Sequence, residues 1–176
     1  TVHADDVGAR MVDDLYARSP AVIAAVVVTL PLLAWVVEAG LHDPWVVVAF
    51  AGYAIANLAR LALVIVVRRR GDRWGTPALR HRLFVAGTLA VGVFLAGLTI
   101  AAYPWLDPAH IALLAVFHTG VMSGALMSLG SSLISYVCYA VPALGSSLVM
   151  LALDDRDWGA RTLLCLVVVY LVVLGM

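Results

Sequence analysis

The side chains with the most specific chemistry in this chain lie inside long apolar segments. His118 lies near the middle of one such segment, and Met122 follows it by one helical turn, so an imidazole and a thioether share one face. Both are ligand types that copper accepts, so copper at this pair is a weak alternative to a site without any metal. The competing interpretations are a histidine that senses a ligand and a neutral histidine hydrogen-bonded to a neighbouring helix.

Arg60 and Asn57 form a second candidate site. Arg60 lies about two turns inside the end of another apolar segment, and Asn57 lies one turn deeper. An ionisable residue inside a membrane is costly and usually has a reason. Either the long side chain reaches lipid headgroups, or the guanidinium binds the acidic headgroup of a ligand. Tyr136 and Tyr139, on a polar stripe of a later segment, complete the candidate ligand-binding residues.

Small residues at helical spacing accompany His118. Gly120, Ser123, Gly124 and Ser128 form this stripe, and the two glycines make a GxxxG motif. Small residues let helix backbones approach closely within a membrane. The stripe therefore predicts a helix-packing seam, and it suits a homodimer contact as well as an internal one.

Six apolar segments position these residues. Hydrophobic residues make up 64% of the 176 residues and charged residues only 12%, whereas a soluble domain is about a quarter charged. A spanning helix needs about 20 mostly apolar residues. We predict an all-α polytopic membrane protein with spans at about 20–37, 45–67, 83–103, 110–129, 133–153 and 160–176, where the fourth and fifth are separated by Gly130-Ser131-Ser132.

The basic residues predict the orientation of these spans. Six arginines between positions 68 and 82 fall in the loop that joins spans two and three, whereas the tryptophans, except Trp74, lie at the opposite ends. Loops rich in arginine stay in the cytoplasm, and tryptophan favours the interfaces. Both termini are therefore expected in the cytoplasm, with the lipid bilayer as the chief partner of the chain.

Residues 1–19 differ from the rest. Val7, Met11 and Leu15 recur every four residues while aspartates lie elsewhere on the wheel, which predicts a short amphipathic helix at the cytoplasmic membrane surface or on a partner. Pro20 suits the first turn of span one. Pro31 is a candidate kink within that span.

Several function classes are disfavoured. No Asp, Glu or Lys lies deep in a span, and an ion-coupled transporter usually needs a buried carboxylate. No catalytic or nucleotide-binding motif is evident, so we expect no enzymatic activity in this chain and assign no catalytic residue. The chain also lacks the basic balance that nucleic-acid binding needs.

With this pattern assembled, the chain resembles the six-span N-terminal membrane sensor module of bacterial histidine kinases or diguanylate cyclases/phosphodiesterases. The resemblance is one of layout, carried by the segments MVDDLYARSPAVIAAVVVTLPLLAWVV, RHRLFVAGTLAVGVFLAG, FHTGVMSGALMSLGSSLISYVCYAVPAL and LLCLVVVYLVVLGM. It implies signal transduction from the bacterial inner membrane, a homodimer, a small hydrophobic ligand and a cytoplasmic output domain after Met176. The alternatives are a small transporter or channel subunit and a dimerising membrane anchor that senses nothing.

Overall fold

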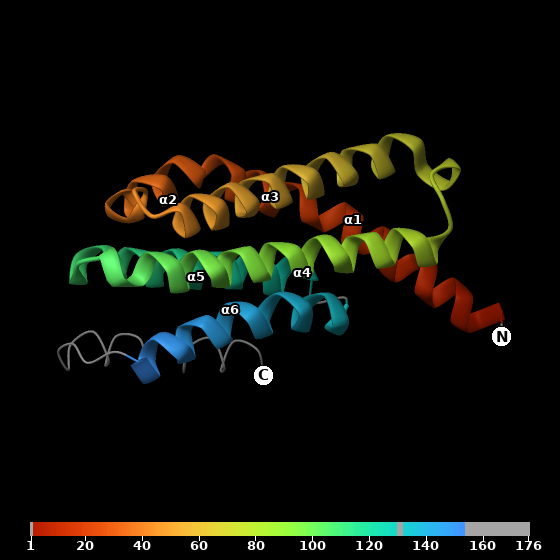
Figure 1. Ribbon diagram of the computed structural model, residues 1–176. Coiled ribbons are helices and arrows are strands. Elements are labelled where there is room, and N and C mark those ends of the chain that lie inside the picture. Colours follow the sequence, from red (N-terminus) through yellow and green to blue (C-terminus); the bar gives the residue numbers. More distant parts are fainter. Residues whose placement is uncertain (1, 130–131, 154–176) are drawn as a thin grey trace.

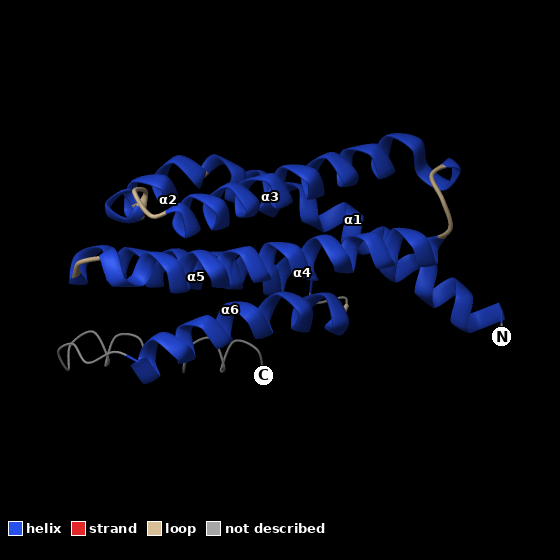
Figure 2. Cartoon of the chain, viewed as in Figure 1, coloured by secondary structure: helices blue, strands red, loops and turns tan. Residues whose placement is uncertain are grey.

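The computed structural model describes residues 2–129 and 132–153, and every regular element in that range is a helix (Figures 1 and 2). The predicted all-α fold is therefore confirmed for this part of the chain. The sixth predicted span, 160–176, lies outside the described residues. The elements are α1 (Val2–Val28), α2 (Leu30–Val36), η1 (Glu38–Gly40), α3 (Pro44–Arg70), η2 (Gly71–Arg73), α4 (Pro77–Ala102), η3 (Tyr103–Trp105), α5 (Pro108–Leu129) and α6 (Leu133–Leu153).

Three of these helices are long and apolar enough to cross a membrane: α3, α4 together with η3, and α5. A fourth span exists if α1 from Arg10 and α2 count as one helix bent by 42°. Within α6 the stretch Leu133–Ser147 is apolar but shorter. The described chain thus has three or four helices able to span a membrane. The six spans and their orientation stay predictions.

The first predicted span is broken, as its proline suggested. α1 ends at Val28, and α2 carries Pro31 in its first turn. Proline has no N–H to continue the helical ladder, and the Thr29 hydroxyl donates to the carbonyl of Val26 at 2.8 Å. The kink at Pro31 is confirmed. Pro20, in contrast, lies inside α1 and starts no new helix.

The helices form two layers (Figure 1). In one layer α4 lies between α3 and α6 and packs against both. In the other, α1 and α2 lie beside α5. Gly92 of α4 lets the backbone of α6 approach closely, because a Cβ there would lie 2.9 Å from the backbone oxygen of Tyr139.

The amphipathic N-terminal segment packs on its own chain. Val12, Leu15 and Tyr16 are buried, and the Tyr16 hydroxyl donates to the carbonyl of Arg80 at 3.0 Å. The Tyr16 ring meets the edge of Phe84, with 5.3 Å between centroids. This face therefore covers the start of α4, and the position of the helix at the membrane surface or on a partner stays a prediction.

An aspartate caps α5. Asp107 precedes Pro108, and its carboxylate accepts from the backbone N–H of His110 at 2.9 Å and from the His110 ring at 2.8 Å. The backbone hydrogen bond, and then the ring, lower the pKa of the Asp107 carboxyl. A carboxyl with a depressed folded-state pKa stabilises the fold above its unfolded pKa, and this contribution is lost as the pH falls through the lower folded value.

We expect Asp107→Ala to lower the thermal stability of the detergent-solubilised chain at neutral pH, because it removes the cap of α5. The difference from wild type should shrink in acid, once the wild-type carboxyl is protonated. Asp107→Asn keeps a side-chain acceptor and should lose less. Melting curves recorded across the acidic range test this, and a difference that is independent of pH would contradict it.

Candidate functional site

A small polar cavity lies between the two helix layers. Its volume is about 20 Å³, which is room for about one water molecule. Its polar lining comes from Asn57 and Arg60 of α3, Ser128 of α5 and Tyr139 of α6. The remaining lining is apolar and comes from α1, α4 and α5. Three of the six predicted ligand-binding residues therefore meet here.

The spacing of residues on α3 explains why its polar side chains face inward. Tyr53, Asn57 and Arg60 recur in steps of four and three, which places them on one face of a helix, and all three are buried. On the opposite face Ile55 is 65% exposed and Leu58 is 50% exposed. Polar residues inside and apolar residues outside suit a helix whose outer surface meets lipid.

Most buried polar groups of these helices are satisfied locally. The hydroxyls of Thr88, Thr99 and Ser146 each donate to a carbonyl of the preceding turn. The Asn57 amide does the same, donating to the carbonyl of Tyr53 at 2.9 Å. None of these four side chains is among the buried groups of the described residues that lack a hydrogen-bond partner.

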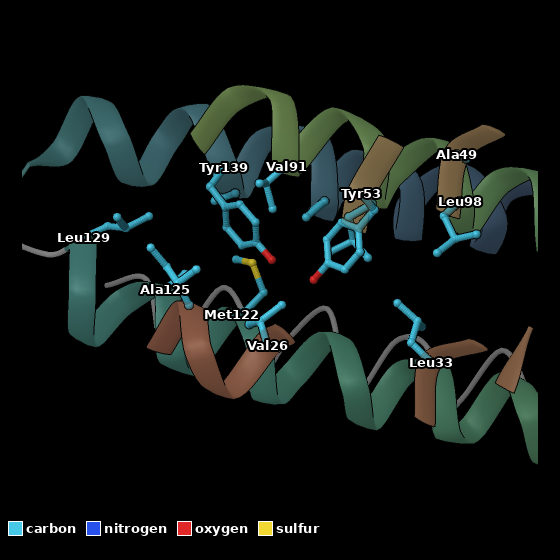
Figure 3. Packing of buried hydrophobic residues seen from close by; sticks show 14 of the residues in the cluster. Val26, Leu33, Ala49, Tyr53, Val91, Leu98, Met122, Ala125, Leu129 and Tyr139 are labelled. Atoms are coloured by element: carbon cyan, nitrogen blue, oxygen red, sulfur yellow. The ribbon is translucent and has the colours of Figure 1, made fainter. Parts of the chain in front are cut away.

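Three groups near the cavity are not satisfied. Within the described residues, the Tyr53 hydroxyl, the Arg60 Nε and the Tyr139 hydroxyl are buried without a hydrogen-bond partner. Leaving such groups unpaired costs roughly 1–3 kcal/mol each. Figure 3 shows both tyrosine hydroxyls pointing from one layer toward the other, where Met122 lies. The cluster can therefore accept a further polar group.

Arg60 is turned into the protein. Its side chain packs along Gly87 of α4, with a Cβ there only 2.9 Å from Arg60 Cγ, and the guanidinium carbon lies 5.3 Å from the Phe84 ring centroid. Arg60 is 8% exposed. The interpretation that it reaches lipid headgroups is therefore wrong. No carboxylate among the described residues forms an ion pair with it.

His118 lies apart from this cluster. It lines a second cavity of about 20 Å³ with Thr99, Ser147 and Met150 among its neighbours. Its Nε2 lies 3.2 Å from the Thr99 hydroxyl. The same hydroxyl lies 2.9 Å from the carbonyl of Leu95, and which group donates in the contact with His118 depends on the tautomer of the imidazole.

This geometry gives His118 a structural partner. Thr99 is a hydrogen-bond partner for the His118 ring, and a role of His118 in ligand sensing stays a prediction. Met122 is buried but does not line the His118 cavity. The described residues contain no group of three or more His, Cys, Asp or Glu suited to a metal. Copper at His118 and Met122 stays a prediction.

We expect Thr99→Val to destabilise the chain by roughly 1–3 kcal/mol, because it removes the hydroxyl that is the hydrogen-bond partner of the buried His118 ring. Thr99→Ser keeps the hydroxyl and should lower the stability clearly less than Thr99→Val does. Unfolding in mixed detergent micelles measures both variants. Equal losses would show that the Thr99 methyl group, and not its hydrogen bond, carries the effect.

Only part of the predicted helix-packing stripe contacts another helix. Gly124 lies against Val22 of α1, with 3.0 Å from its ideal Cβ to Val22 Cγ1, whereas a Cβ at Gly120 would meet nothing within 4 Å. Ser123 donates to the carbonyl of Thr119, and Ser128 reaches the polar cavity. Of the expected GxxxG pair, one glycine packs and the other faces open space.

Three important residues were missed from the sequence. Tyr53 lies one turn before Asn57 on the same face, a signal that was present. Thr99 shows only as a polar residue within an apolar segment. Gly92 has no local signal, because its role depends on where α6 lies. Tyr136, a predicted pocket residue, is half-buried against the core and lines neither cavity.

The described arrangement thus offers a buried cation with two free hydroxyls between helix layers, and a separate histidine with a fixed partner. Comparison with protein-family models, curated proteins and solved structures finds no match to this chain.

Proposed function

We propose that this chain is the membrane-embedded sensory input domain of a bacterial signalling protein. It lies in the inner membrane as six spans with both termini in the cytoplasm, and it acts as a homodimer. A small lipophilic signal binds within the helices, and the change passes through span six to a cytoplasmic histidine kinase or cyclic-di-GMP enzyme. The layout of the sequence and the unsatisfied interior support this proposal.

The observation that carries it is the cluster of Arg60, Tyr53 and Tyr139. Tyr53 of α3 and Tyr139 of α6 point toward the layer of α1 and α5 (Figure 3), and Arg60 of α3 lines the same cavity as Tyr139. A ligand that satisfies these groups stabilises one packing of the two layers over another, and such differential binding is what shifts a conformational equilibrium. Because α6 carries Tyr139 and precedes the last predicted span, the shift has a route toward the cytoplasm.

The test uses the full-length protein in lipid nanodiscs. Its output activity, either autophosphorylation or turnover of cyclic-di-GMP, is measured while extracts of bacterial membranes are added. We expect a change in activity that is lost in Arg60→Met and retained in the control variant Gly145→Leu, because a Cβ at Gly145 would meet nothing within 4 Å. Activity that ignores every extract would favour the dimerising anchor, and substrate flux into sealed vesicles would favour the transporter.

A further inference from the structure

An apolar groove on the outside of α1 and α5 adjoins the polar cavity. It is lined by α1 between Ala21 and Val26, by Thr29 just after α1, and by α5 between Phe117 and Gly124. Its volume is about 450 Å³, within the range of small-molecule sites. Val22, Val26 and Val121 line both the groove and the cavity. One wall of valine side chains therefore separates an apolar groove from a buried guanidinium.

The groove and the cavity follow one another along the helices. On α5 the groove is lined by residues between Phe117 and Gly124, and the cavity is lined by residues between Val121 and Leu129. A ligand occupying both would place an apolar part toward Phe117 and a polar part toward Ser128. The site thus has the polarity of an amphiphile.

The positive charge that lines the cavity favours a ligand with an anionic headgroup. Arg60 is nine-tenths buried, and the described residues supply it with no acidic partner. A buried cation without a counter-ion is costly, and an anion with hydrogen-bond acceptors offsets that cost. The unpaired hydroxyl of Tyr139 is a further donor to such an anion.

We propose that the groove and the cavity together bind a single-chain amphiphile with a carboxylate headgroup, of the long-chain fatty acid class. The carboxylate pairs with the Arg60 guanidinium and accepts from Tyr139, while the acyl chain lies between α1 and α5. A carboxylate needs more room than one water molecule, so its entry moves the valine wall. This inference deepens the proposed function by naming the signal.

Charge complementarity favours this occupant over a segment of protein. The sixth predicted span, 160–176, contains no Asp or Glu, so it would cover the groove but leave Arg60 unneutralised. The groove face of a second copy is equally apolar. A fatty acid supplies both the apolar chain and the anion.

The experiment measures binding of radiolabelled palmitate to the purified chain in detergent, with methyl palmitate and palmityl alcohol as competitors. We expect saturable binding that neither uncharged analogue displaces. Arg60→Met should weaken it roughly ten- to a hundredfold, because one charge-assisted contact is lost. Arg60→Lys keeps the charge and should weaken it less.

The groove has its own matched pair of variants. Gly120 and Gly145 both have open space around an added Cβ, but only Gly120 lines the groove. Gly120→Leu should abolish palmitate binding, and Gly145→Leu should leave it unchanged. Size-exclusion profiles and melting curves confirm that each variant is folded.

Several results would overturn the inference. They are displacement of palmitate by its methyl ester, equal binding by Arg60→Met, and an absence of binding while Gly120→Cys cross-links two copies. The proposed function can fail separately. If palmitate binds but does not alter the output activity, the sensing function is contradicted and the palmitate-binding site is still supported. If the output activity responds to membrane extracts but the chain does not bind palmitate, the sensing function is supported and the palmitate site is contradicted.

Discussion

Gly92→Ala is expected to destabilise the chain by about 1–3 kcal/mol, because overpacking a tight contact forces helices apart. The added Cβ would lie 2.9 Å from the backbone oxygen and 3.2 Å from the Cα of Tyr139. Backbone atoms cannot rotate away as the end of a side chain can. The contact between α4 and α6 must open, and Tyr139 must move with it. The free energy of unfolding in mixed detergent micelles measures the loss.

Gly120→Ala is the control for this prediction. Its Cβ meets nothing within 4 Å, and alanine is favoured over glycine within a helix by about 0.5–1 kcal/mol. Gly120→Ala should therefore be neutral or stabilising. The sequence pattern alone predicts the opposite order, because Gly120 belongs to the GxxxG motif. If Gly120→Ala costs more than Gly92→Ala, the main close contact lies on the α5 face, as in a dimer seam.

Arg60→Met is expected to raise the free energy of unfolding by about 1–3 kcal/mol in the absence of ligand. It removes a buried charge without an acidic partner among the described residues and keeps an unbranched stem of similar length along Gly87. The same change should remove the stabilisation that palmitate gives to the wild type, because a ligand stabilises only the state that binds it. Melting curves with and without palmitate measure both effects.

Arg80 provides the matched comparison. It is as buried as Arg60, but it forms an ion pair of 3.4 Å with Asp13. Arg80→Met should therefore lower stability, where Arg60→Met raises it. A fall in stability for both variants would mean that Arg60 is satisfied in the folded protein, and the inferred carboxylate site would lose its main support.

The sequence was informative about elements because each apolar segment is longer than a turn or strand requires. The predicted segments 45–67, 110–129 and 133–153 agree in their bounds with the helices α3, α5 and α6 within a few residues, and of these α3 and α5 are long and apolar enough to cross a membrane. Aspartate or threonine before proline marks the starts of α3, α4 and α5, where the side chain accepts from a backbone N–H of the first turn. The break near Pro31 follows equally from local chemistry.

The same reasoning was weaker for the first helix. Pro20 reads as a helix start, because proline is favoured in a first turn, yet α1 continues through it. The helix is held on both sides of Pro20 by packing against α3, α4 and α5. Tertiary contacts outweigh one lost hydrogen bond, and a sequence pattern has no measure of those contacts.

The candidate site also has features that follow from one helix and features that depend on how helices pack together. The residue types and their spacing on α3 placed Asn57 and Arg60 on one face, and this is a property of a single helix. Which residues share a cavity depends on how separate helices meet. Tyr139 joins Arg60, whereas His118, Met122 and Tyr136 do not line that cavity.

The sequence by itself thus determined the helices, their polar faces and the rarity of charge within them, because these follow from periodicity and local hydrogen bonding. Only the tertiary structure decided that Arg60 points inward, that Thr99 holds His118, and that Gly92 rather than Gly120 makes the close contact. Each of these depends on the register between two helices far apart in the chain, and side-chain packing across the layers sets that register.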